Sequence, residues 1–300
     1  MQKSSQISPQ DIEKLIANGL EYQNAGKIEL AQSYYLKALK FSPREPNAVH
    51  YLGVAYHQLE DNEQAEKYLK DALELKPEDS QAHNHYGCAL LTLDKLSEAE
   101  QAFRKSIELN SSNADAFFNL AQLISRDKIL KQSKNDEERE KIASEAVELL
   151  NKAVTLNPKQ LEWKVKLAGA LLQAGQEELA GKVLNFILQQ KIDHPEVYFL
   201  RSRIQSGRSA FHSLQKSLLL KPDAKSALNN FGFWNLTAEK KFDALIWFRR
   251  AMISEPDDVE VQWNHAVGLL ANGYLENGWA AAKCRHLKPE MYIERLGLPP

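Results

Sequence analysis

Small residues return along the chain at a regular spacing, and this spacing organises the whole sequence. Glycines stand 34 positions apart at Gly19, Gly53 and Gly87. With a first unit starting near Ile12, further units start near Pro46, Ser80, Ala114, Leu161, Pro195, Lys225 and Val259. The fourth unit is longer and the sixth is shorter than the others. When the units are aligned with this difference allowed for, the eighth and twentieth places of all eight hold Gly, Ala or Ser, with Ala146 and Ala210 at the twentieth place of the fourth and sixth units. Such self-similarity is typical of a repeat architecture.

Apolar and polar residues within each unit follow a helical period. In the first unit Ala31, Tyr35 and Ala38 stand at i, i+4 and i+7, on one face of a helix. Small residues on two facing helices allow their axes to approach closely. Prolines, which stop helices, close most units: Pro43, Pro77, Pro158, Pro222 and Pro256. No segment sustains the period-two alternation of a strand, so the pattern predicts an all-α fold of helix pairs.

The period, the small residues and the closing prolines resemble the tetratricopeptide repeat, from Ile12 to about Pro289. The resemblance implies a right-handed superhelical solenoid of about eight helix pairs, in which the first helix of each pair lines a concave groove. It also implies that no repeat folds alone. We therefore expect a tail over 1–11, a solenoid over 12–288, and a capping helix or linker over 289–300.

The fourth unit carries an insertion near 126–140. The inserted stretch contains no Gly or Pro, and Asn135 is a suitable N-cap for the acidic residues that follow it. We predict two lengthened helices that form a charged spur with a bend near Ser133. A disordered loop is the alternative.

Composition narrows the class of function. The formal net charge is −2, too balanced for a nucleic-acid-coating protein or a single-stranded RNA binder. Two cysteines, Cys88 and Cys284, provide no disulfide framework, and no signal-peptide core or membrane-spanning apolar stretch is present. No nucleotide-binding, zinc-protease or hydrolase motif occurs. We expect a cytoplasmic, non-enzymatic protein without a cofactor, a nucleic-acid partner or a membrane partner.

One set of side chains has ligand-type chemistry. His50 and His57 lie seven positions apart on one helix face, and His85 and Cys88 follow on the equivalent helix of the next unit. Their spacing matches no zinc pattern, so we interpret them as polar groove residues and predict no metal site.

Asparagines recur where the first helices should face the groove. Asn has poor helix propensity, and its amide can bond a peptide N–H and C=O together, so its recurrence favours binding of an extended chain. The alternative for these Asn residues is that they bond neighbouring helices or water. Aromatic residues beside them could anchor a bound chain, and the alternative for these aromatics is packing between repeats. The predicted peptide-binding residues are Asn84, His85, Asn119, Asn229, Asn230, Phe233, Trp263 and Asn264.

A second resemblance concerns the sixth place of each unit. An Asn ladder lines the repeats of O-linked N-acetylglucosamine transferases, where it holds the backbone of the polypeptide substrate. Asn119, Asn230 and Asn264 match that ladder, whereas Lys166 and Leu200 interrupt it. The segment 270–279 also resembles the last half-repeat of bacterial repeat proteins that continue into a glycosyltransferase domain. A substrate-recruiting arm of such an enzyme is therefore the alternative to a free-standing interaction module with a protein or peptide partner.

Overall fold

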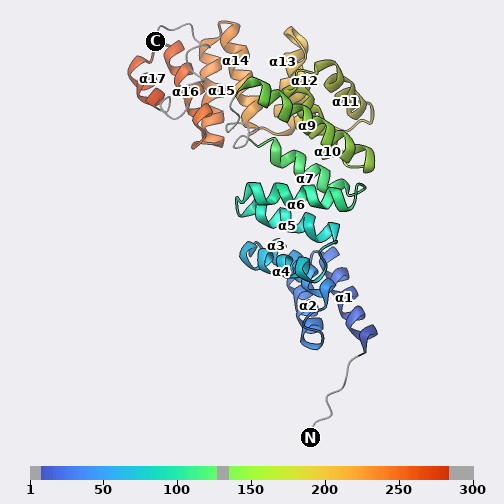
Figure 1. Cartoon of the computed structure of the whole chain (residues 1–300). Coiled ribbons are helices and arrows are strands. Elements are labelled where there is room, and N and C mark those ends of the chain that lie inside the picture. Colours follow the sequence, from blue (N-terminus) through green and yellow to red (C-terminus); the bar gives the residue numbers. More distant parts are fainter. Residues whose placement is uncertain (1–7, 127–134, 284–300) are drawn as a thin grey trace. The chain divides into compact units, whose positions relative to one another are not determined.

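A computed structural model describes residues 8–126 and 135–283 of the chain, and the regular elements in those ranges are helices, with no strand. The chain divides into two compact units, residues 1–174 and 175–300. Figure 1 shows the helices following one another along each unit, mostly as pairs; the boundary falls between α10 (Leu161–Gln173) and α11 (Glu177–Gln189), the two helices of the fifth repeat. The all-α fold predicted from the repeat pattern is confirmed for the described residues.

The first unit contains nine described helices. They are α1 (Pro9–Asn24), α2 (Ile28–Phe41), α3 (Pro46–Gln58), α4 (Asn62–Leu75), α5 (Ser80–Thr92), α6 (Leu96–Leu109), α7 (Ala114–Ile124), α9 (Asp136–Leu156) and α10 (Leu161–Gln173). The helices of a pair pack on each other, and the second helix of a pair packs on the first helix of the next, as α4 does on α5. Leu90, Phe103 and Leu120 form a core shared by neighbouring repeats, so a repeat depends on its neighbour for burial of apolar surface.

The second unit contains seven described helices. They are α11 (Glu177–Gln189), α12 (Pro195–Arg203), α13 (Gly207–Leu220), α14 (Lys225–Thr237), α15 (Lys241–Ser254), α16 (Val259–Ala271) and α17 (Leu275–Ala281). Its core has the same construction, with Leu214, Leu228, Phe231 and Val261 buried together from α13, α14 and α16.

The small residue at the eighth place has a direct packing reason. A Cβ atom built on Gly87 would lie 2.6 Å from the ring of Phe103, and one built on Gly232 would lie 2.5 Å from the ring of Phe248. Real Cβ atoms do not approach so closely, so only glycine lets the aromatic ring of the second helix reach the first helix. The repeated small residues therefore follow from the large residue that each one faces.

The first helix begins before Ile12, the residue at which the sequence pattern starts the first repeat. Pro9 occupies the first turn of α1, and Ser8 caps it in a reciprocal capping box with Asp11. The Ser8 hydroxyl accepts from the Asp11 backbone N–H, and the Asp11 carboxylate accepts from the Ser8 N–H, so two free N–H groups of the helix start are satisfied.

The insertion of the fourth repeat lengthens only one of its two flanking helices, so the prediction of two lengthened helices is wrong. α7 ends at Ile124, and the backbone N–H and hydroxyl of Ser125 both donate to the Ala121 carbonyl in its last turn. α9 is lengthened to 21 residues and begins after Asn135, whose side chain accepts from the Glu138 N–H as predicted for an N-cap. The predicted bend at Ser133 lies outside the described residues.

Candidate functional site

The predicted site residues lie on first helices of the two units and differ in exposure. Asn84 on α5, Asn229 on α14, and Trp263 and Asn264 on α16 are buried. The remaining four are partly exposed: His85, Asn119, Asn230 and Phe233. Only these four present surface to a partner without a rearrangement of the helices.

In the compact unit 1–174, the fifth and sixth places of neighbouring repeats are joined by two side-chain pairs. The imidazoles of His50 on α3 and His85 on α5 share a hydrogen bond of 2.8 Å between Nε2 and Nδ1. The Asn119 Nδ2 on α7 donates to the Asn84 Oδ1 on α5 over 3.0 Å. Each pair links the fifth place of one repeat to the sixth place of the next. Asn84 and Asn119 therefore bond a neighbouring helix, which is the role that the alternative interpretation gave them.

The same two places in the second unit hold Asn229 and Asn264. Asn229 Oδ1 and Asn264 Nδ2 are buried and have no hydrogen-bond partner in the described part of the chain. Asn229 Oδ1 is an acceptor and Asn264 Nδ2 is a donor, as are Asn84 Oδ1 and Asn119 Nδ2 in the hydrogen bond of the first unit. An unpaired buried amide atom is costly, and a hydrogen bond between these two atoms would satisfy both.

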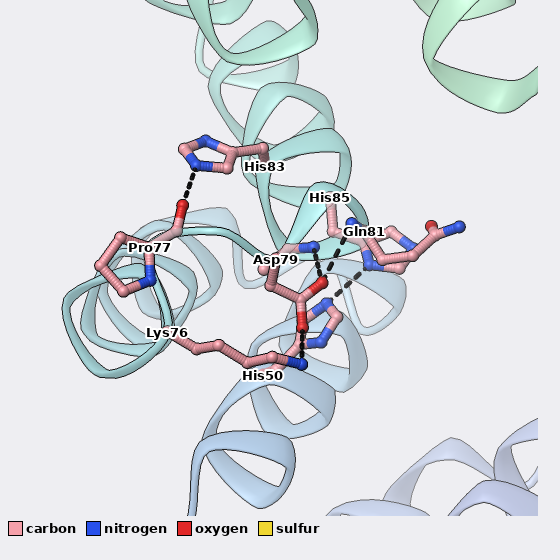
Figure 2. A network of polar contacts seen from close by, with 8 residues as sticks. His50, Lys76, Pro77, Asp79, Gln81, His83 and His85 are labelled. Carbon is pink, nitrogen blue, oxygen red and sulfur yellow. Dashed lines mark hydrogen bonds and ion pairs between the residues drawn. The ribbon is translucent and has the colours of Figure 1, made fainter. Parts of the chain in front are cut away.

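Figure 2 shows the polar network around the histidine pair. Asp79 caps α5: one carboxylate oxygen accepts from the N–H groups of Gln81 and Ala82, at 3.0 and 3.1 Å. The other accepts from Lys76 Nζ at 2.8 Å. Although burial raises the pKa of Asp79, these hydrogen bonds outweigh it and leave the pKa below the usual value. The carboxylate is therefore held ionised as a structural cap.

The electrostatics of this region favour neutral, unreactive side chains. Burial lowers the pKa of His50 to about 4 and, together with the neighbouring His50, that of His85 to about 4. Burial also raises the pKa of the Cys88 thiol to about 12, so it is protonated and accepts a hydrogen bond from Asn119 Nδ2 at 3.3 Å. His57 turns to the Asn62 side chain instead, at 2.7 Å. His50 and His85 thus bond each other, whereas His57 and Cys88 bond other side chains, and no group of three or more ligand-type residues that could hold a metal occurs among those described.

The aromatic site residues of the second unit take part in packing. Phe233 meets Phe248 edge to face, with ring centroids 5.1 Å apart. Trp263 is buried in a cluster with Ala266, Val267 and Ala282. Phe233 keeps part of its surface exposed one helical turn from Asn230, so it remains available on this side of α14.

A hollow between α1 and α3 was missed by the sequence reasoning. It has a volume of about 560 Å³, and its lining includes Ile12, Ala17 and Leu20 of α1 and Tyr51 of α3. The sequence does contain a sign of this hollow at the sixth place. Ala17 is small, whereas the next three repeats carry Tyr51, His85 and Asn119 there. A small residue at a place that elsewhere holds a large one leaves space on the face of the first helices.

Together these features define a helical repeat protein whose first helices carry the polar and aromatic candidate residues. Models of the tetratricopeptide repeat match residues 16–80, 58–114 and 140–204, which together make up more than half of the chain. The chain belongs to the tetratricopeptide repeat family. No protein with a curated description matches it.

Solved structures show the same fold. PilF of Pseudomonas aeruginosa superposes with a TM-score of 0.60 at 20% identity, covering 76% of this chain and 97% of PilF. A tetratricopeptide repeat protein of Parabacteroides merdae gives a TM-score of 0.60 at 13% identity, covering 87% and 99% of the two chains. PilW, a type IV pilus biogenesis factor, gives 0.59 at 18% identity, covering 73% and 98%. At these identities the similarity establishes the fold alone.

A helix that crosses a bilayer needs about 20 mostly apolar residues, so it must be both long and apolar. None of the helices within residues 8–126 and 135–283 meets both requirements for crossing a membrane.

Proposed function

We propose that this chain is a non-catalytic protein-interaction module that binds an extended polypeptide segment along its first helices. The observation that carries the proposal is the amide of Asn230, which is partly exposed on α14 and has no hydrogen-bond partner among the described residues. Tetratricopeptide repeats present extended concave surfaces to their partners, and an amide at such a surface supplies both a donor and an acceptor to a peptide backbone.

Asn119 supports the proposal at the same place of the fourth repeat. Its Nδ2 is used by Asn84 and Cys88, but its Oδ1 has no partner in the described part of the chain. Because it is partly exposed, this oxygen remains available to accept from a backbone N–H of a bound segment. Beside Asn230, the exposed part of Phe233 adds an apolar contact of the kind that anchors peptides. The buried Asn84, Asn229, Trp263 and Asn264 serve in the proposal as supports for these neighbours.

The test is affinity capture from a lysate of the source cells with matched variants. Asn119→Ala combined with Asn230→Ala removes one amide from each unit, and Asn151→Ala combined with Asn185→Ala removes two exposed amides from the second helices α9 and α11. We expect the first variant to lose polypeptides that the wild type and the second variant retain. Circular dichroism and a thermal melt confirm that each variant is folded. Equal capture by all three proteins would refute the proposal.

The alternative proposal is a substrate-recruiting arm of a glycosyltransferase, which rests on the resemblance of segment 270–279. Packing explains part of that resemblance: a Cβ atom on Gly278 would lie 2.6 Å from the Leu270 side chain, so a small residue is needed there in any role. Trp279, which follows Gly278, is half exposed. Sequencing the gene beyond the codon for Pro300 distinguishes the proposals, because the alternative requires a transferase domain in the same reading frame.

A further inference from the structure

The hollow between α1 and α3 is an unassigned surface on the first helices of the first two repeats. It has a volume of about 560 Å³, within the range of ligand sites. Residues from α1, from the turn after α2 and from α3 surround it, so it opens on the face to which the proposed function assigns the partner. Its lining consists of Pro9, Ile12, Glu13, Ile16, Ala17, Leu20, Ser42, Glu45, Asn47 and Tyr51.

Apolar side chains form one part of this lining. Ile16 is buried, Ile12 and Leu20 are half-buried, and Ala17 is exposed and too short to fill the space between them. The ring of Tyr51 forms a wall and is held by stacking on His50, with centroids 5.1 Å apart. An aliphatic side chain of a partner that entered here would bury apolar surface on several sides.

Two carboxylates form the charged part of the lining. The Glu13 side chain is exposed on α1, and Glu45 directly precedes α3 but does not use its side chain to cap that helix. Neither has an ion-pair partner within residues 8–126 and 135–283, and the lining contains no Lys or Arg. Lys14, which follows Glu13 in sequence, is paired with Asp11 at 3.9 Å. The hollow therefore presents two uncompensated negative charges beside an apolar floor.

From this arrangement we infer that the hollow binds a cationic segment of a polypeptide, with an aliphatic side chain seated between basic ones. The inference rests on the proposed function and specifies its partner. The aliphatic side chain contacts Ile12, Ile16 and Leu20, while the flanking Lys or Arg side chains reach Glu13 and Glu45. An extended chain advances about 3.3 Å per residue, so about three residues cross the distance between neighbouring first helices. Phosphate-bearing ligands are repelled by the same carboxylates.

Binding of short labelled peptides to the full chain tests the inference. The probes are fluorescein-labelled Gly-Lys-Leu-Lys-Gly, a second peptide with Glu in place of both Lys residues, and a third with Ser in place of Leu. Fluorescence polarisation in 50 mM and 300 mM NaCl gives the dissociation constants. We expect the Lys-Leu-Lys peptide to bind at least about tenfold more tightly than either of the others, and to weaken as salt screens the charges.

Paired variants locate the binding site. Glu13→Gln combined with Glu45→Gln should weaken binding of the Lys-Leu-Lys peptide by about fivefold to tenfold, since each exposed contact contributes modestly. Asp71→Asn combined with Glu74→Gln removes two exposed carboxylates from α4, outside the hollow, and should leave the affinity unchanged. Thermal melts confirm that both variants are folded.

Three results would overturn the inference. The first is equal affinity for the Lys and Glu peptides, the second is no binding of any peptide, and the third is equal weakening by the two pairs of variants. In each case the proposed function is judged separately, because the capture experiment with Asn119 and Asn230 uses the natural partners and leaves Glu13 and Glu45 intact.

Discussion

Asn119 Nδ2 donates a hydrogen bond of 3.0 Å to Asn84 Oδ1, across the boundary between two repeats. His50 and His85 meet in the same register one repeat earlier, with 2.8 Å between their ring nitrogens. A side chain at the fifth place of one repeat thus bonds a side chain at the sixth place of the next. Since the sixth place also borders the first-helix surface, these bonds position the residues that would meet a partner.

The bond between Asn84 and Asn119 should be measurable in stability. Asn84→Ala removes the acceptor from a buried position and is expected to lower the free energy of unfolding by about 1–2 kcal/mol. Asn230→Ala, at a partly exposed residue without a hydrogen-bond partner among those described, should change it by less than about 0.5 kcal/mol. Urea unfolding of the full chain measures both. A loss for Asn84→Ala as small as that for Asn230→Ala would show that the bond contributes nothing.

The histidine pair predicts a dependence of stability on pH. Burial lowers the pKa of His50 and His85 in the folded chain to about 4, from an ordinary value of 6.5. The unfolded chain therefore binds more protons between these values, so stability is complete above pH 6.5 and falls as the pH drops toward 4. The slope is up to about 1.4 kcal/mol per pH unit for each histidine. Burial also lowers the pKa of His265, which adds to the same trend.

A matched variant isolates the contribution of the pair. His50→Asn combined with His85→Asn places at these positions the residue types that Asn84 and Asn119 provide one repeat later, and it removes both titrating groups. Urea unfolding at pH 7.5, 6, 5 and 4.5 should give a flatter profile for this variant than for the wild type. Parallel profiles would mean that the two histidines do not cause the acid sensitivity.

The turn within each helix pair offers a stabilising change. One position in this turn has positive φ in six repeats. It is glycine in three of them, including Gly26 at 73°, and Glu60 at 64°, Asp94 at 59° and Glu239 at 60° in the other three. A left-handed conformation strains a residue with a Cβ atom, so Glu60→Gly and Glu239→Gly should each raise the free energy of unfolding by about 0.5–1 kcal/mol. Gly26→Ala should lower it. A drop in melting temperature for both Glu→Gly variants would contradict this account.

Glycine at the eighth place predicts a compensating pair of substitutions. Gly87→Ala should cost about 1–3 kcal/mol, because its new Cβ atom would collide with the Phe103 ring. Adding Phe103→Leu should recover part of that loss, since the fourth repeat carries Ala121 and Leu150 at these places. A double-mutant cycle in urea measures the coupling. If the two changes added independently, the fit between glycine and ring would not be the reason for the glycine.

The fold could be predicted from the sequence because its determinants are local and repeated. The pairing of Gly87 with Phe103 recurs as Gly232 with Phe248, so each instance strengthens the interpretation of the other. The end of α7 could not be predicted in this way. α7 ends at Ile124 although the inserted stretch after it contains no Gly or Pro, so no residue of the usual helix-stopping types marks this end in the sequence.

The candidate site could be predicted only in part. Periodicity placed Asn84, Asn229 and Asn264 on the first helices, but a difference of a few tens of degrees around a helix decides whether a side chain lies at the surface or between two repeats. All three are buried. The hollow at Ala17 arises from what several side chains leave unfilled, and no single residue in the sequence announces it.

The most direct test of the central claim is site-specific photo-crosslinking in the source cells. The photoreactive residue p-benzoylphenylalanine would replace Tyr51 or Phe233 on first helices, and Leu36 or Phe242, exposed on second helices, as controls. Mass spectrometry then identifies the crosslinked polypeptides. The account predicts crosslinks to partner polypeptides at Tyr51 and Phe233 and few or none at Leu36 and Phe242. Crosslinks confined to Leu36 and Phe242 would contradict it.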